Sequence, residues 1–278
     1  MISPHDQMLL AGNSMSRRPW RLIGLACVVV VPFGVLLLLS VGSGWTYPHV
    51  VPDRIDGSPW RWLAGNRDRL FSALLTSMML STAVGALATA FGLVIARFVR
   101  RSNSSIVRFA LYLPLVVSPV IAATSLYDLL IRLQLAGTLP GVLFAQLSFA
   151  TSFGAVFFLE VWSDRTDRLE LLVRSLGGRT RDVWKHVVIH EVRSLIPICF
   201  VQCAMFSWLD YGLVSILGGG RVVTLTMRLF GYIREASVNH AAMAAIVLVS
   251  PILTGVIVLS MTHMWSRLAT RFVRTSHE

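Results

Sequence analysis

Charged residues are scarce in this 278-residue chain: they make up 14%, where an ordinary soluble protein has about a quarter. Cysteine is also rare, and three residues do not provide the framework of a small disulfide-stabilised scaffold. Hydrophobic residues reach 55% and the mean hydropathy is +0.67, which excludes a disordered chain and most soluble folds. This composition is typical of a protein embedded in a lipid bilayer.

Lysine is almost absent, because Lys185 is the only one and all other basic residues are arginine. A P-loop needs a Gly-Lys pair whose lysine reaches the nucleotide phosphates, but Lys185 follows Trp184. We therefore expect no nucleotide hydrolysis by this chain. The net charge is +11, and the basic residues that produce it lie between apolar runs rather than in a separate domain. This arrangement favours a membrane surface over nucleic acid as the partner.

Long apolar runs dominate the sequence. Five of them contain no Asp, Glu, Lys or Arg, a sixth is interrupted only by Asp210, and each is long enough to cross a bilayer as a helix. The expected spans are Leu22–Gly44, Leu70–Ala96, Phe109–Tyr127, Leu133–Leu159, Ser194–Gly220 and Ala236–Ser266. We expect an all-α membrane protein with a six-helix domain over residues 22–266 and short tails at 1–21 and 267–278.

The distribution of basic residues predicts the orientation of these spans. The two tails, the connection between spans two and three and the connection between spans four and five together hold 17 of the 25 basic residues. Since Lys and Arg favour cytoplasmic connections, both termini are expected in the cytoplasm. Ser16-Arg17-Arg18 resembles a twin-arginine export signal, but the apolar run after it is too long and lacks a cleavage site. We therefore expect an uncleaved anchor.

Small residues and prolines mark two of the expected spans. The second span has small side chains at a spacing that suits close helix packing: Ser77, Ser81, Gly85 and Ala88. Pro114 and Pro119 are expected to bend the third span. Such a bend either opens room for a path between helices or fits the helix against a neighbour.

The connection over residues 163–194 has helical patterning of its own. An apolar stripe at helical spacing predicts a first helix, and three acids in its opening turns, Asp164, Asp167 and Glu170, are expected as caps and dipole partners. The stripe consists of Leu169, Leu172, Val173 and Leu176. Gly177-Gly178 then predicts a turn. This segment forms either a surface for a cytoplasmic partner or a solvated loop on the headgroups.

A second short helix is expected after this turn, from about Thr180 to His190. Its apolar residues share one side and are Val183, Trp184, Val187 and Val188. The whole connection is thus expected to form a helix, a glycine turn and a helix.

The stretch from Leu169 to Gly178, continuing through residues 184–189, resembles the EAA loop of permease subunits in binding-protein-dependent ABC importers. The Arg-Ser-Leu-Gly core and the later Val-Val-Ile have the separation of that motif, although Leu172 and Val173 replace its two small residues and His190 replaces its proline. The resemblance implies that the loop docks on an ATPase. The implied docking residues are Leu169, Glu170, Leu172, Val173, Arg174, Ser175, Leu176, Gly177, Gly178, Val183 and Trp184.

The resemblance also implies the partners of the chain. They are cytoplasmic ABC ATPase subunits that bind ATP and Mg, a second permease subunit of the same or a homologous chain, and an extracytoplasmic solute-binding protein. Membrane lipid surrounds such a permease in the bacterial plasma (inner) membrane. More weakly, the stretches 207–212 and 218–226 resemble the subgroup that imports ferric iron, thiamine, polyamines or phosphonates.

Asp210 is the acidic residue within an expected span, where an ionisable side chain is costly unless it faces protein or water. It either lines a translocation path or gate, or it pairs with an arginine such as Arg221. We expect the path to include Asp210, Tyr211, Pro114 and Pro119. An autonomous secondary transporter that couples protons or cations through Asp210 is the alternative function.

Two further pairs of residues have spacings that could suggest chemistry. His186 and His190 could hold a metal on one helix face, which would suit a membrane enzyme, but the sequence around them offers no third ligand. Cys199 and Cys203 share a face of an apolar span, where small thiols usually serve packing. We expect no catalytic residue, no metal and no cofactor in this chain.

Overall fold

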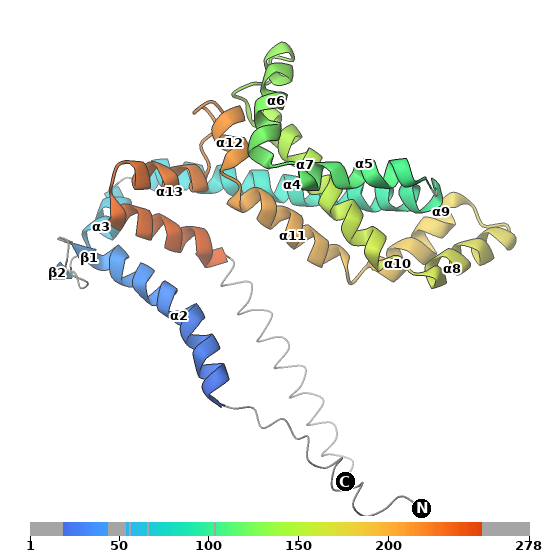
Figure 1. Ribbon diagram of the computed structural model, residues 1–278, viewed down its shortest axis with the longest axis horizontal. Coiled ribbons are helices and arrows are strands. Elements are labelled where there is room, and N and C mark those ends of the chain that lie inside the picture. The colour runs from blue at the N-terminus through green and yellow to red at the C-terminus, as the bar shows by residue number, and fades with distance from the viewer. Residues whose placement is uncertain (1–18, 44–53, 56, 66, 103, 252–278) are drawn as a thin grey trace, which may run out of the picture. The chain divides into compact units, whose positions relative to one another are not determined.

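The computed structural model describes residues 19–43, 54–55, 57–65, 67–102 and 104–251, and nearly all of these residues are helical (Figure 1). The chain forms two compact units, of which one holds residues 63–235 and the other holds residues 1–62 and 236–278. The first elements are α2 (Pro19–Val41), β1 (Gly42–Ser43), β2 (Arg54–Ile55), α3 (Ser58–Gly65), α4 (Arg67–Ser102), α5 (Ser105–Val116), α6 (Pro119–Arg132) and α7 (Leu139–Val161). The later elements are α8 (Asp164–Ser175), α9 (Thr180–Val183), the π-helical turn η1 (Trp184–Val188), α10 (Ile189–Val192), α11 (Ile196–Leu209), α12 (Gly212–Leu217) and α13 (Leu225–Arg234).

The smaller unit joins the two ends of the described chain. Helix α2 covers most of the first expected span, and a last helix, Val238–Pro251, covers the start of the sixth. Strands β1 and β2 form a two-residue antiparallel ladder that pairs Gly42 with Ile55. The Asn239 side chain donates a hydrogen bond to the Gly42 carbonyl, so the last helix is tied to the end of α2.

The larger unit is built on α4, which lies beside α7 and α11 (Figure 1). Small residues allow this close approach, as the sequence predicts for the second span. A Cβ atom on Gly85 would lie 2.9 Å from the Ala204 Cβ, and one on Gly92 would lie 2.7 Å from the Gly154 carbonyl carbon. The Ser77 hydroxyl, one of the predicted small residues, accepts a hydrogen bond of 2.8 Å from the Leu225 amide.

Two helices of the described residues are long and apolar enough to cross a membrane, Arg69–Ser102 and Leu139–Val161. Two further candidates are bent pairs, so the structure supports up to four spans among the described residues. The fold class is thus confirmed as helical and membrane-like. The number of six spans remains a prediction, because residues 1–18 and 252–278, which include about half of the span expected at 236–266, lie outside the described residues.

Prolines divide the third expected span as the sequence predicts, although the break is sharper than a kink. Helices α5 and α6 meet at 102°, with Ser118 extended and Pro119 in the first turn of α6. Proline suits this position because its missing amide hydrogen has no helical partner there anyway. Pro114 lies inside α5.

The expected span 194–220 is divided too. Helix α11 ends at Leu209, Asp210 is extended, and α12 begins two residues later. Asp210 therefore lies at a break between helices rather than within a continuous one.

The close contact between α4 and α7 gives a test of the packing. Gly92→Ala places a Cβ 2.7 Å from backbone atoms, so the two helices must separate. We expect the free energy of unfolding to fall by about 1–3 kcal/mol, as for other overpacked sites. Thermal unfolding of the purified chain in detergent measures this change.

Gly231→Ala in α13 is the matched control, because nothing lies within 4 Å of its added Cβ. This variant is expected to keep or raise the midpoint temperature of thermal unfolding, since alanine stabilises a helix more than glycine does. Equal midpoints for the two variants would contradict the close packing of α4 on α7.

Candidate functional site

The connection between α7 and α11 folds as the predicted helix, glycine turn and helix. Helix α8 begins after Ser163, whose hydroxyl accepts a hydrogen bond from the Thr166 amide. Ser163 is thus the cap of this helix, whereas Asp167 and Glu170, which were expected as caps, form ion pairs with arginines.

Both glycines of the turn are required by geometry. Gly177 has a φ of +82°, a conformation that side chains with a Cβ rarely adopt. A Cβ on Gly178 would lie 2.5 Å from the Val173 Cγ1 atom. The Gly178 amide donates to the Val173 carbonyl at 2.9 Å, which closes the end of α8.

The second helix consists of α9, η1 and α10 and continues to Val192, two residues beyond the predicted end. Its apolar side is the predicted one: Val183, Val187 and Val188 are buried and Trp184 is half-buried. This helix therefore holds the connection against the body of the larger unit.

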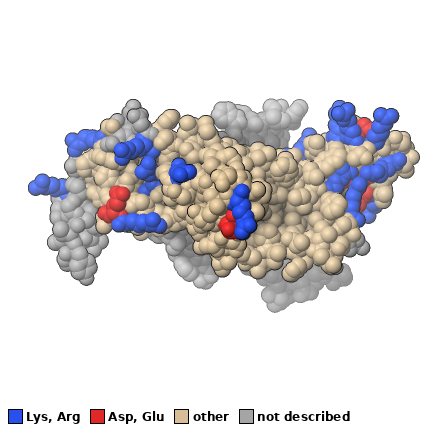
Figure 2. All heavy atoms as spheres, turned by 90° about the horizontal axis from the view of Figure 1, so that it is seen from above, with Lys and Arg blue, Asp and Glu red and all other residues tan. Residues whose placement is uncertain are grey.

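The two faces of α8 differ in what they contact. Thr166 and Glu170 are buried on one face, whereas Leu171, Leu172 and Leu176 are 67%, 56% and 79% exposed. Leu172 and Leu176 of the predicted apolar stripe therefore face away from the chain, whereas Val173 packs against the core. Arginines Arg165, Arg168, Arg174, Arg179 and Arg181 are exposed around it. Lys and Arg side chains gather over this segment, at the right of the view, while the surface beside it is mostly uncharged (Figure 2).

Glu170 is buried against the C-terminal end of α4. Its Oε2 atom accepts a hydrogen bond of 3.0 Å from the Arg97 Nη2 atom and a second one from Arg101. The Arg97 Nε atom lies 3.0 Å from the Glu170 Oε1 atom. Arg97 and Glu170 are each 5% exposed. Removal of one partner from such a buried pair commonly costs about 3–5 kcal/mol, because the other charge is left uncompensated.

Two neighbouring contacts extend this cluster. Asp167, one turn before Glu170, forms an ion pair of 2.9 Å with Arg100 and accepts a hydrogen bond of 3.0 Å from the Trp162 indole. The guanidinium carbon of Arg97 lies 4.7 Å from the centre of the Trp184 ring, within the range of a cation–π interaction. Arg97 thus contacts both helices of the connection.

The structure divides the implied docking residues by exposure. Leu172, Arg174, Ser175, Leu176 and Gly177 are exposed, and Leu169, Val173, Gly178 and Trp184 are partly so. Glu170 and Val183 are buried and face the chain itself. These two residues can position the surface but cannot contact a partner directly. The arginines of α4 were used in the sequence only to predict membrane orientation. Their spacing of one helical turn is the same as that of Asp167 and Glu170 in α8, with which they form ion pairs.

The break at Asp210 forms a second polar cluster. The Asp210 Oδ2 atom accepts a hydrogen bond of 2.7 Å from the Gln146 side-chain amide, and Oδ1 accepts one of 3.2 Å from the Leu213 amide. Gln146 is fully buried in α7, and its Oε1 atom accepts a hydrogen bond of 2.7 Å from the Ser207 hydroxyl. Gln146 was not among the residues predicted for the path, although it is a rare amide in an apolar helix.

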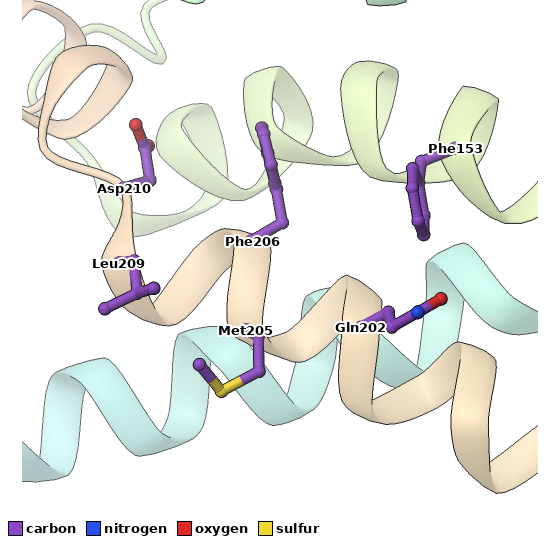
Figure 3. A pocket seen from close by; sticks show the side chains of 6 residues that line it. All are labelled: Phe153, Gln202, Met205, Phe206, Leu209 and Asp210. Carbon is purple, nitrogen blue, oxygen red and sulfur yellow. The ribbon is translucent and has the colours of Figure 1, made fainter. Parts of the chain in front are cut away.

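Asp210 also lies at the edge of a cavity of about 440 Å³. Figure 3 shows its side chain beyond Phe206 at the end of α11. The lining residues are Phe153, Gln202, Met205, Phe206, Leu209 and Asp210. An acid at the edge of an apolar cavity gives the cavity a single negative contact point.

The other expected path residues are distributed over several helices. The Tyr211 ring stacks on Phe230 with centroids 4.2 Å apart, and its hydroxyl accepts a hydrogen bond from Arg234. Pro119 starts α6, which packs against α12 just after the Asp210 break, whereas Pro114 lies in α5 against α7.

Arg221, the alternative partner expected for Asp210, lies elsewhere. Its side chain lies against Gly137, and no ion pair joins it to Asp210 in the part of the chain that the structure describes. His186 places its Nδ1 atom 3.1 Å from the Asp182 carbonyl oxygen. Across the described ranges, no three His, Cys, Asp or Glu side chains gather as metal ligands.

The Gln146 bridge can be tested by Gln146→Leu. This change removes the side-chain partner of both the Asp210 carboxylate and the Ser207 hydroxyl, and unpaired buried polar groups cost about 1–3 kcal/mol each. We expect a lower thermal midpoint in detergent. Gln202→Leu, an exposed glutamine at the same cavity, is the control and should leave the midpoint nearly unchanged. Equal effects of the two changes would show that the bridge does not stabilise the break.

Comparison with known proteins shows similarity at the level of structure rather than of sequence. The sequence matches no protein-family model and no curated protein. Among solved structures, the chain is similar to the crystal structure of a bacterial ABC transporter involved in the import of the acidic polysaccharide alginate. The sequence identity is 16%, the TM-score is 0.45, and the similarity covers 94% of this chain and 98% of the other.

Proposed function

We propose that this chain is the transmembrane permease subunit of an ABC-type importer and forms the translocation path for a small solute. Separate cytoplasmic ATPase subunits, which bind ATP and Mg, drive the uptake. A second permease subunit completes the path, and an extracytoplasmic solute-binding protein delivers the solute. The chain lies in the bacterial plasma membrane with both termini in the cytoplasm, and it has no catalytic residue of its own.

One observation is the main support for this proposal: the α8–α10 connection presents apolar side chains outward while its other face is fixed to the chain. Leu171, Leu172 and Leu176 are exposed on a segment that is too charged to lie in a bilayer. Exposed apolar residues rimmed by charge mark protein interaction sites. The same segment contains the stretch that resembles the EAA loop, so an ATPase subunit is the partner that fits it.

The proposed mechanism follows from this attachment. When ATP closes the two ATPase subunits, the docked connection moves with them, and the helices of the larger unit change their packing between inward- and outward-facing states. The partner that is bound selects between the two states by its differential affinity for them. Asp210, Tyr211 and Pro119 lie near the break between α11 and α12, which is the region we propose for the path.

Asp210 also favours a second candidate, an autonomous transporter coupled to protons or cations. Its carboxylate has hydrogen-bond partners but no ion-pair partner among the described residues. An ionisable group of this kind is a common element of proton relays. Uptake by such a transporter would stop when an ionophore is added and would continue without ATP. Uptake by the proposed importer would continue with the ionophore and stop without ATP.

The docking surface is tested by Leu176→Asp, which places a charge on the exposed leucine that directly follows α8. We expect the amount of ATPase subunit that copurifies with the chain to fall at least tenfold, because a charge must lose its hydration at the interface. An ABC ATPase subunit expressed together with the chain is the probe.

Ile233→Asp in α13 is the control, since Ile233 is 54% exposed and lies on the side predicted to be extracytoplasmic. It should leave the copurified amount unchanged. If the unaltered chain retains no ATPase subunit, or if Leu176→Asp retains as much as the control, the proposed docking is wrong.

A further inference from the structure

A buried ion-pair cluster lies where the proposed docking segment meets the membrane helices. Arg97, Arg101 and Glu170 form it, and we call these three residues the α4–α8 joint. We propose that the α4–α8 joint transmits the movement of the docked connection to α4. This inference rests on the proposed function and adds the route by which the docking segment acts on the helices.

Position and burial support a role inside the chain rather than at its surface. Arg97 and Glu170 are both nearly inaccessible, whereas Leu171, Leu172 and Leu176 are exposed. A partner on the leucines therefore cannot touch Arg97 or Glu170, and only Arg101, whose side chain is 48% exposed, is an accessible member of the joint. Arg97 and Glu170 are positioning residues, which act on the partner only through the placement of α8.

The chemistry of the joint fixes one arrangement of the two helices. Two arginines one turn apart on α4 both bind the same Glu170 oxygen. Hydrophobic side chains of similar volume stabilise a buried position at least as well as an ion pair does, but they tolerate sliding. The hydrogen bonds from Arg97 and Arg101 converge on the Oε2 atom, and such charge-assisted bonds hold direction as well as distance because they need alignment. The Arg97 Nε and Glu170 Oε1 atoms add a close contact of opposite charges without a hydrogen bond.

Neighbouring contacts prevent rotation about the joint. The Asp167–Arg100 ion pair lies one turn away on both helices, with half-exposed side chains, so it adds direction more than stability. Trp184 stacks on Arg97 from the second helix of the connection. One arginine thus links α4 to both helices, and the segment is expected to move as one body with the end of α4.

Helix α4 is suited to carry such a movement further. It has 36 residues, more than any other helix of the described chain, and it packs along both α7 and α11. The chain link to α11 is bent, because Thr180–Val192 meets Ile196–Leu209 at 72°. The second helix of the connection adds apolar contacts with the core through Val183, Val188 and Val192, and the joint adds a directional contact with α4.

The test uses Glu170→Gln in the full chain, coexpressed with its ATPase subunit and placed in lipid nanodiscs. Hydrogen exchange of peptides from α8 and from the end of α4 is measured with and without MgATP. In the unaltered complex we expect MgATP to change the exchange of both peptides together. In Glu170→Gln we expect α8 to exchange at least tenfold faster, the ATPase subunit to be retained within twofold, and the response of the α4 peptide to MgATP to disappear.

Glu160→Gln is the matched control, because Glu160 lies at the end of α7 and bonds to the exposed Tyr112 hydroxyl rather than to α4. It should behave as the unaltered chain. Should Glu170→Gln fail to accumulate, Arg97→Lys, which keeps the charge but loses the paired geometry, is expected to weaken the α4 response in part.

The outcomes separate this inference from the proposed function. Retention of the ATPase subunit with an unchanged α4 response in Glu170→Gln overturns the role of the joint alone. Loss of the ATPase subunit from Glu170→Gln also overturns it, because the joint would then be part of docking. Absence of any retained ATPase subunit from the unaltered chain overturns the proposed function itself.

Discussion

Glu170 is the point on which the placement of the α8–α10 connection depends. A carboxylate that is almost fully buried must be neutralised, and Arg97 and Arg101 of α4 do this and donate hydrogen bonds to its Oε2 atom. This requirement decides which face of α8 turns inward. Once Glu170 faces α4, the leucines on the other side of the helix have no place in the chain and remain exposed.

The apolar part of the chain follows a different constraint, which is close contact between backbones. Gly85, Gly92 and Gly154 let α4 approach α11 and α7 so closely that an added Cβ would overlap neighbouring atoms. Contacts of this kind suit a membrane, where lipid tails remove the hydrophobic advantage of burying leucines between helices. The rigid packing of α4 and the ion pairs at its end make one continuous element from the core to the proposed docking surface.

Much of the connection could be predicted from the sequence because its signals are local. The apolar spacing indicated both helices, the glycine pair indicated the turn, and Pro114 with Pro119 indicated a bend in the third expected span. Helix caps were less predictable. Asp167 and Glu170 were expected to interact with their own helix, but an ion pair with a helix about 70 residues earlier in the chain is stronger than a dipole contact.

The sequence by itself determined the helical, membrane-like class, the helix boundaries near the glycine turn and the absence of a P-loop lysine, since composition and short-range spacing decide these features. Only the tertiary structure decided which residues meet across the chain: Arg97 with Glu170 and Trp184, Gln146 with Asp210 and Ser207, and Gly92 with Gly154. A charge-free run or a stripe of leucines has the same pattern whether it faces a neighbour or the outside. Which face of a helix is buried depends on residues distant in the sequence, because a buried polar side chain needs a hydrogen-bond partner.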